Sequence, residues 1–247
     1  MSLPTDKLTD KLYDFQDRVL IGLSHLFKKV SPRDSKIVLS GGTALTRGWL
    51  GHRISDDLDF FFKSDRFIRD ANLFLKELPH GIGQYIIRDK WDTLVNVDLF
   101  SREENMRLRI QLIESQIYYD LEGRGILQGV PLDSIQNIFS EKIAAVLDRM
   151  EPKDVADIYA ILTLHGGFSV ADIIQEAVPK GINVRPLSFC QAIDDFNYAS
   201  LDNIRWLIDI NSKGIEKYMR QVVKEIVKTG DFMAPRVSPP PRPGPNR

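Results

Sequence analysis

Residues 40–60 read SGGTALTRGWLGHRISDDLDF, a glycine pair followed by two aspartates that stand one residue apart. Gly41 and Gly42 come after a short apolar segment, and glycine permits positive φ and a close approach of the backbone to a ligand. The turn leads into a helix, whose free N–H groups and dipole favour an anion, and Thr43 adds a hydroxyl that can cap this helix. The turn is therefore a candidate phosphate site, and a plain strand-to-helix turn is the common alternative.

The two aspartates of this stretch are candidate metal ligands. Successive side chains of a strand point to opposite faces, so Asp57 and Asp59 share one face. Leu58, Phe60 and Phe62 share the other face and can anchor the strand in a core. Two carboxylates on a rigid strand suit an oxygen-seeking cation such as Mg²⁺, which often bridges substrate phosphates. An exposed acidic strand end is the alternative, and it is the combination with the glycine turn that favours a site.

The hydrophobic pattern around this stretch predicts strands in the first half of the chain and helices in the second. The expected strands span residues 36–40, 58–62, 84–88, 93–100 and 107–113. The expected helices span residues 5–30, 43–50, 66–78, 133–149, 153–164, 169–178, 187–196, 202–209 and 212–228. This order is typical of an α+β fold, in which a mixed sheet with helices is followed by a helical C-terminal domain.

The same pattern divides the chain into three regions. Residues 1–130 are expected to form the α+β domain, with an N-terminal helix and the sheet, and residues 123–129 are read as a loop. Residues 131–230 are expected to form a helical domain that completes the site. Residues 231–247 are rich in proline and poor in large apolar side chains, which predicts disorder.

Composition and charge exclude several classes of protein. The 247 residues are 43% hydrophobic and carry a net charge of −1, so a nucleic acid would have to contact a local basic patch. No apolar run approaches the roughly 20 residues of a membrane span, and the N-terminus has no signal-peptide pattern. The single cysteine, Cys190, cannot form an internal disulfide. We therefore expect a soluble cytoplasmic protein with no membrane attachment. The histidines form no zinc pattern, and no P-loop occurs.

A second group of charged residues lies in the expected helices of the second half. Lys142 and Arg149 are seven residues apart and share a helix face. Asp154, near the start of the next helix, fits a helix cap or a partner of the helix dipole. Asp157, one turn further on, can orient Lys142 or Arg149, or act as a base toward an incoming hydroxyl. For an isolated lysine, a solvated helix face is the better interpretation.

These motifs together resemble a known family. GGTAL followed by GHRISDDLDFF, and EKIAAVLDR followed by KDVADIYAI, resemble the AbiEii/AbiGii toxin family of the DNA polymerase β-like nucleotidyltransferase superfamily. The matching blocks run in the family's order from about residue 38 to residue 162. The resemblance implies a nucleotidyltransferase domain, an NTP substrate and Mg²⁺. It also implies transfer of a nucleoside monophosphate to a hydroxyl, with tRNA as the acceptor, by a toxin that a partner antitoxin neutralises.

The resemblance also implies roles for individual residues. Two acids on the metal, with a lysine and an acid from the second half, would form the catalytic group: Asp57, Asp59, Lys142 and Asp157. The nucleotide would be held at the glycine turn, at a pocket rim formed by an arginine and a serine, and by the lysine at the triphosphate: Gly41, Gly42, Thr43, Arg53, Ser55 and Lys142.

Two positions depart from the family's pattern. Lys153 stands where the family has an arginine before Asp154, so a bidentate contact is lost. Gln111 stands at the centre of a strand where polymerase β-like enzymes commonly place a third acid. Asp98 is the best substitute as a further metal ligand, ahead of Glu114. Without a substitute, metal binding would rest on two acids and substrate oxygens.

Two other functions stay open. A non-catalytic module that binds a nucleotide or a partner would account for Gln111. An enzyme that attaches the nucleotide to a protein, or to its own Ser55, would use the same site. An RNA acceptor would need basic contacts, either from Arg107 and Arg109 on one strand face or from residues near the motif. The basic residues near the motif are Arg47, His52, Arg53, Lys63, Arg66 and Arg69.

Overall fold

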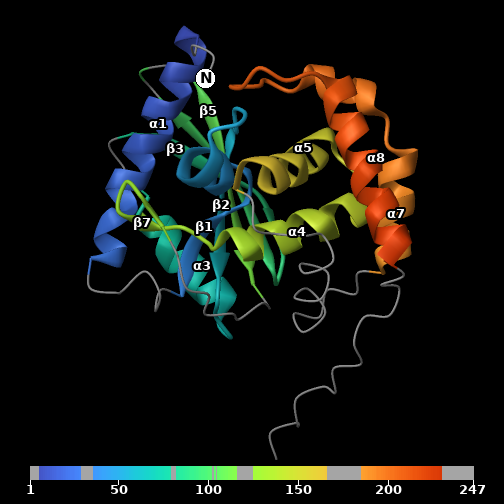
Figure 1. Cartoon of the computed structure of the whole chain (residues 1–247). Helices are drawn as coiled ribbons and strands as arrows, with labels where there is room; N and C mark the ends of the chain where they lie inside the picture. The colour runs from blue at the N-terminus through green and yellow to red at the C-terminus, as the bar shows by residue number, and fades with distance from the viewer. Residues whose placement is uncertain are drawn as a thin grey trace, which may run out of the picture.

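A five-stranded mixed sheet forms the centre of the molecule, with helices on both of its faces (Figure 1). The computed structural model describes residues 6–28, 36–78, 82–101, 103, 105–115, 125–165 and 185–229. The strands are β1 (Ile37–Ser40), β2 (Asp57–Phe62), β3 (Gly83–Lys90), β4 (Leu94–Ser101) and β5 (Arg107–Glu114). Their order across the sheet is β1-β2-β5-β4-β3, in which β2 and β5 are parallel and the other neighbours are antiparallel. The predicted α+β fold and the predicted pairing of β4 with β5 are both confirmed.

The two faces of β2 differ in the way that the alternation predicts. Leu58, Phe60 and Phe62 are fully buried and belong to the hydrophobic core. On that face the helix α3 (Phe67–Lys76) covers the sheet, and the rings of Phe60 and Phe74 lie 4.8 Å apart. Asp57 and Asp59 therefore point to the opposite face, which α4 approaches.

The helices follow the apolar spacing of the sequence closely. They are α1 (Lys7–Leu23), η1 (Ser24–Phe27), α2 (Gly41–Thr43), η3 (Ala44–Leu50), α4 (Ile135–Asp148), α5 (Pro152–Ala160), η4 (Ile161–His165), α7 (Pro186–Asp195), η6 (Tyr198–Asn203) and α8 (Ser212–Thr229). Side-chain caps fix two of the starts. Asp6 accepts a hydrogen bond from the N–H of Thr9 at the start of α1, and Ser134 accepts one from the N–H of Asn137 at the start of α4. Such a cap stabilises a helix by about 1 kcal/mol.

Three local predictions were wrong. The helix after the glycine pair begins at Gly41 with Ser40 at its N-cap, not Thr43, and it widens into a π-helix from Ala44. Residues 126–131, read in part as loop, contain the short antiparallel strands β6 (Ile126–Leu127) and β7 (Val130–Pro131).

The expected helix over residues 202–209 is also wrong. The 3₁₀-helix η6 ends at Asn203, and the chain then runs beside the segment that precedes β2. The N–H of Leu207 donates to the carbonyl of His52 at 2.9 Å, and the N–H of Ile54 donates to the carbonyl of Arg205 at 2.9 Å. These hydrogen bonds to the segment before β2 satisfy backbone N–H and C=O groups that a helix would have paired with each other.

The helices of the second half share one hydrophobic core with the sheet. In Figure 1, α4 and α5 lie between the sheet and the pair formed by α7 and α8. Buried side chains from α1 to α8 form a single cluster, and Cys190 is one of them. The division at residue 130 stays a prediction, and the predicted helix 169–178 and tail 231–247 lie outside the described residues. Among the described helices, none has the length and apolar character that crossing a bilayer requires.

Candidate active site

The glycine turn lies directly against the second aspartate of β2. Ser40 is the partner of Asp59 in the antiparallel pair of β1 and β2, which places Gly41 beside the Asp59 carboxylate. Gly41 has φ +66°, and a Cβ atom added to it would lie 2.1 Å from Oδ2 of Asp59. Only glycine fits this position, because any side chain would strain the backbone and displace the carboxylate. The glycine thus permits a close approach of the turn to Asp59, and an approach to a ligand stays a prediction.

The second glycine covers two residues that were expected at a pocket rim. A Cβ atom on Gly42 would lie 2.7 Å from Oγ of Ser55 and 2.8 Å from Nη2 of Arg53. Arg53 is 4% exposed and Ser55 is 7% exposed. Both side chains thus lie in the interior beneath the turn, and the expectation that they form a rim is wrong. The burial of Ser55 also removes it from reach as a target of self-modification.

Thr43 is turned inward and ties the turn to β2. Its side chain is fully buried, and its hydroxyl donates a hydrogen bond to the backbone carbonyl of Asp57. That hydroxyl is the donor which the sequence analysis expected to face a phosphate. In the structure it instead holds the glycine turn and the first aspartate in a fixed relation.

Asp57 and Asp59 form an electrostatically unfavourable pair. Burial, followed by the charge of Asp57, raises the pKa of Asp59 to about 6. Burial also raises the pKa of Asp57, although the neighbouring charge of Arg109 opposes that effect. Within the described part of the chain, Oδ1 of Asp59 is buried and has no hydrogen-bond partner. A buried carboxylate oxygen without a donor is costly for folding, so this arrangement points to a ligand.

The residues at this point fit a hard divalent cation. Asp57 and Asp59 supply carboxylate oxygens, which are the ligands that such cations prefer, and the bare Cα of Gly41 lets the turn lie directly against Asp59. No group of three His, Cys, Asp or Glu side chains suited to a metal occurs among the described residues. A cation here would therefore be held by two acids together with neutral oxygens of the protein, the substrate or water.

A cavity of about 200 Å³ opens next to Asp59. Its walls come from the turn, the open face of β2 and β5, and the helix α4: Gly41, Asp59, Phe61, Gln111, Ile113, Glu141, Lys142, Ala145, Asp148 and Arg149. Glu141 and Asp148 were missed by the sequence analysis, although Glu141 directly precedes Lys142. The Ser40 hydroxyl lies 3.1 Å from Glu141 and 3.0 Å from Asp133, and it has one proton to donate between them.

Asp98 does not join the aspartate pair. It lies in β4, and in the sheet register Arg109 of β5 separates it from Asp57. Its buried carboxylate accepts a hydrogen bond from Arg88 at 2.6 Å and lies 3.6 Å from Arg107. Neighbouring strands are about 5 Å apart and β5 lies between β4 and β2, so Asp98 is about 10 Å from the strand that carries Asp57 and Asp59.

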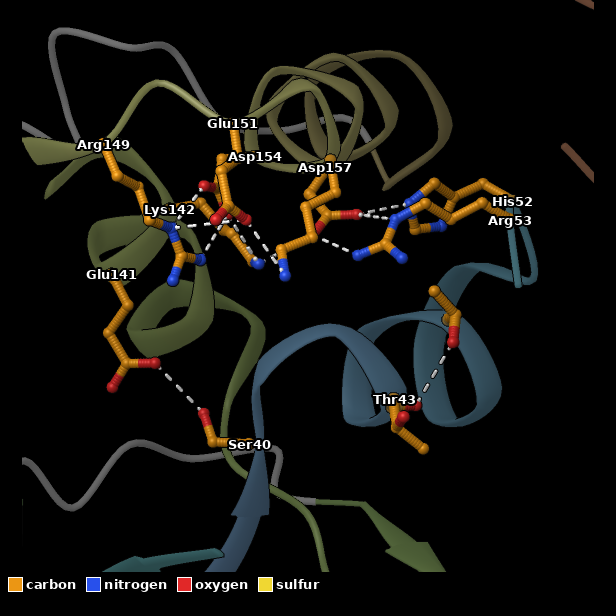
Figure 2. A network of polar contacts seen from close by, with 12 residues as sticks. Ser40, Thr43, His52, Arg53, Glu141, Lys142, Arg149, Glu151, Asp154 and Asp157 are labelled. Carbon is orange, nitrogen blue, oxygen red and sulfur yellow. Dashed lines mark hydrogen bonds and ion pairs between the residues drawn. The ribbon is translucent and has the colours of Figure 1, made fainter. Parts of the chain in front are cut away.

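A buried row of alternating charges connects the motif loop, residues 51–56 before β2, to α4 and α5 (Figure 2). Asp157 is fully buried, and it accepts two hydrogen bonds from Arg53 at 2.7 and 2.8 Å and one from His52 at 2.8 Å. The ammonium of Lys142 lies 2.9 Å from Asp157 and 3.0 Å from Asp154. Of the two residues that Asp157 was expected to orient, it contacts Lys142 and not Arg149, and His52, Arg53 and Lys142 enclose its carboxylate.

The ionisation of the row follows from its geometry. Burial opposes ionisation of Asp157, but the charges of Arg53 and Lys142 and the hydrogen bonds outweigh it and hold its pKa well below the usual range. Burial lowers the pKa of His52 despite its contact with Asp157, so its ring is neutral near pH 7. Lys142 keeps its charge because Asp157 and Asp154 raise its pKa against the effect of burial.

Asp154 lies in the first turn of α5, as a partner of the helix dipole would, but it is not the helix cap. Glu151 occupies the N-cap position of α5, whereas Asp154 is fully buried and accepts hydrogen bonds from Lys142 and Arg149. Nε and Nη2 of Arg149 meet its two oxygens at 2.9 and 3.0 Å, which is a forked contact. Lys153 makes a single ion pair with Glu151 at 3.0 Å.

Comparisons with known proteins identify a family and similar folds. The family model described as "Nucleotidyl transferase AbiEii toxin, Type IV TA system" matches residues 25–85 and 77–205. No curated protein matches the chain in sequence. MenT4, a nucleotidyltransferase toxin from Mycobacterium tuberculosis H37Rv, is similar in structure, with a TM-score of 0.63 and 17% identity over 89% of this chain and 84% of that chain. JHP933 from Helicobacter pylori has a TM-score of 0.60 and 16% identity over 92% of this chain and 94% of that chain.

These solved structures support the fold, and the family model carries the assignment. Its two matched segments together extend from residue 25 to residue 205, well over half of the 247 residues. They include the glycine turn, both aspartates of β2 and the charged row. The protein therefore belongs to the AbiEii family of nucleotidyltransferase toxins of type IV toxin–antitoxin systems.

Proposed function

We propose that the protein transfers a nucleoside monophosphate from an NTP to a hydroxyl of tRNA, with Mg²⁺ held by Asp57 and Asp59. One observation carries this proposal: the Gly41 turn lies against Asp59, whose buried Oδ1 has no partner among the described residues. An enzyme of the cytoplasm with an antitoxin partner fits a toxin of this family.

The reaction consists of one substitution at phosphorus. The acceptor hydroxyl attacks the α-phosphorus, the bond to the β-phosphate oxygen breaks, and pyrophosphate leaves while the hydroxyl proton passes to solvent. A bound Mg²⁺ would supply a positive charge for the phosphate oxygens. Gly41 lets the backbone of the turn lie against the Asp59 carboxylate, and Thr43 keeps the turn fixed to β2. Lys142 and Arg149 add positive charge to the cavity wall, held there by Asp154.

Exposed arginines beside the aspartates support a nucleic-acid acceptor. Arg109 is the β5 partner of Asp57 in the sheet register, and Arg107 lies on the same face of that strand. Arg107 and Arg88 are each about half exposed, and both lie near the carboxylate of Asp98. These guanidinium groups, on the sheet face that carries Asp57, can contact the phosphates of an RNA strand.

A transfer assay tests the proposal. Purified protein is incubated with Mg²⁺, each labelled NTP in turn and total tRNA, and the double variant Asp57→Ala/Asp59→Ala is the matched control. We expect label in tRNA with the wild-type protein and none with the control, whose fold is checked by circular dichroism. Equal labelling by both proteins would show that neither aspartate is needed for transfer. Label on protein instead of RNA would favour the protein-modifying alternative.

A nucleotide-binding module without activity is the second candidate, and one observation favours it. Gln111 is the β5 partner of Asp59, so an amide stands at the position of the expected third acid. Such a module would be stabilised against heat by an NTP and would form no covalent product with any acceptor.

The glycine turn yields a specific prediction. Gly41→Ala should lower transfer by about a hundredfold or more, because its Cβ would displace the Asp59 carboxylate and small misplacements at a reacting centre have effects of this size. Gly51→Ala is the matched control, because Gly51 has a similar φ of +63° but its Cβ would meet only the carbonyl of Thr46 at 4.0 Å. Both variants should lose about 1 kcal/mol of stability from backbone strain. Equal transfer by the two variants would show that the contact with Asp59 is not needed.

A further inference from the structure

Gln111 lies beside Asp59 on the open face of the sheet. The parallel strands β2 and β5 pair Asp59 with Gln111, so both side chains leave the same face on neighbouring strands. Both also line the cavity that opens at the glycine turn. An uncharged side chain thus occupies the place nearest to the aspartate pair on the adjacent strand.

A chain of hydrogen bonds fixes which end of the Gln111 amide faces the cavity. The carboxylate of Asp89 accepts a hydrogen bond from Nδ2 of Asn96 at 3.1 Å. Because a carboxylate accepts and does not donate, the amide nitrogen of Asn96 must face Asp89, and its Oδ1 must face the other way. Oδ1 of Asn96 then accepts a hydrogen bond from Nε2 of Gln111 at 2.7 Å. The nitrogen of Gln111 is therefore directed toward β4, and its oxygen Oε1 is left available.

The oxygen of Gln111 has the properties of a metal ligand. Among the described residues, no hydrogen-bond donor is directed at Oε1, whereas the nitrogen of the same amide is engaged. Neutral carbonyl oxygens of Asn and Gln are ordinary ligands of hard divalent cations. Asp98, the best acidic candidate for a third ligand, is already occupied by Arg88 and Arg107. Glu114, the weaker candidate, pairs in register with Phe62 and so lies on the opposite face of the sheet. The third position beside the aspartates is thus filled by an oriented oxygen without charge.

We propose that Oε1 of Gln111 is the third protein oxygen that binds the divalent cation with Asp57 and Asp59, and that Asn96 and Asp89 orient it. This inference rests on the proposed function, because it concerns the cation of that site. The protein ligands then carry a charge of −2 instead of the −3 of three acids. A cation is held less tightly by such a set, so its binding depends more on the phosphates of the NTP.

Binding of Mn²⁺ alone tests the proposal without any measurement of activity. The free Mn²⁺ signal in electron paramagnetic resonance is titrated with the wild-type protein and with Gln111→Leu, Gln111→Glu and Asn96→Leu. We expect about tenfold weaker binding for Gln111→Leu and about tenfold tighter binding for Gln111→Glu, in the range seen when groups around a metal are changed. Asn96→Leu should give an intermediate loss, because Gln111 remains but is no longer oriented.

A matched control and an independent assay separate the outcomes. Asp98→Asn changes an acid on the same sheet face and should leave Mn²⁺ affinity unchanged, and thermal unfolding checks that every variant is folded. Equal affinity of Gln111→Leu and the wild type would overturn the inference, as would Mn²⁺ binding too weak to detect in the wild type. Transfer to tRNA by the wild type would then still support the proposed function. Loss of affinity in Gln111→Leu without transfer by the wild type would support the inference and contradict the proposed function.

Discussion

Asp59→Asn is expected to abolish nucleotide transfer while it raises the free energy of unfolding. Activity should fall about a thousandfold or more, because the variant loses a charged ligand at the point where phosphate charge has to be balanced. A residue that only supports the fold would behave in the opposite way, since its loss would lower stability and activity together. The two measurements therefore distinguish a catalytic role from a structural one.

The gain in stability follows from the electrostatics of the pair. Burial and the charge of Asp57 raise the pKa of Asp59 from 3.8 to about 6, a difference worth about 3 kcal/mol against the ionised form. An acid whose pKa is raised by folding destabilises the folded state above that pKa, and the penalty disappears as the pH falls toward 3.8. Asp59→Asn should therefore raise the free energy of unfolding by about 1 to 3 kcal/mol at pH 7.5, with little effect near pH 4.

Urea unfolding in the presence of EDTA measures this effect, because a bound cation would conceal it. Asp56→Asn is the matched control, since Asp56 is exposed and its contact is with Arg205 at the surface. That variant should change stability by less than about 1 kcal/mol and keep transfer activity. If Asp59→Asn kept more than a tenth of the wild-type transfer, or lost stability at pH 7.5, Asp59 would have a structural role instead.

The sequence predicted the sheet well because strand alternation is a local property. Leu58, Phe60 and Phe62 could be assigned to one face without a partner strand in view, and the two aspartates followed from the same period. Helical spacing likewise located α4 and α5. The segment at residues 204–207 was misread because its partners are the backbone groups of residues 52–54, about 150 positions earlier.

The site was harder to predict because charge partners are chosen in three dimensions. Arg53 carries the same charge whether it faces a phosphate or Asp157, and only the packing of α5 beneath the turn reveals the second case. The sequence position of Asp154, near the start of a helix, suggested a helix cap. In the structure, Lys142 of α4 and Arg149 at its end donate hydrogen bonds to the Asp154 carboxylate. Residue type and spacing thus located the charged groups, and the structure determined their partners.

Asp157→Asn is expected to destabilise the protein by about 3 to 5 kcal/mol, the range seen when one partner of a buried ion pair is removed. Arg53 is 4% exposed and Lys142 is 6% exposed, so neither cation can turn to water when the carboxylate is lost. The amide of asparagine would also direct N–H groups at donors from His52 and Arg53. The motif loop, α4 and α5 would lose their common contact.

Two control variants test whether the loss of stability in Asp157→Asn comes from an unpaired buried charge. Asp194→Asn removes an exposed acid that pairs with Arg220 at 3.1 Å, and it should change stability by less than about 1 kcal/mol. The double variant Arg53→Met/Asp157→Leu replaces the buried pair with apolar groups. It should be more stable than Asp157→Asn, because the guanidinium is removed with the carboxylate and Lys142 keeps its contact with Asp154. Recovery in the double variant would show that the unpaired charge causes the loss.

The pH dependence of the unfolding free energy separately tests whether the ionised form of Asp157 stabilises the fold. The pKa of Asp157 is lower in the folded protein than its ordinary value of 3.8, so its ionised form stabilises the fold. That contribution is complete above the unfolded value and is lost as the pH falls below it toward the folded value. The difference in unfolding free energy between the wild type and Asp157→Asn should therefore stay constant from about pH 5 to pH 8 and shrink below about pH 4. Urea unfolding at a series of pH values measures it, and a difference that grew toward low pH would mean that Asp157 is not held as the ion-paired carboxylate of this row.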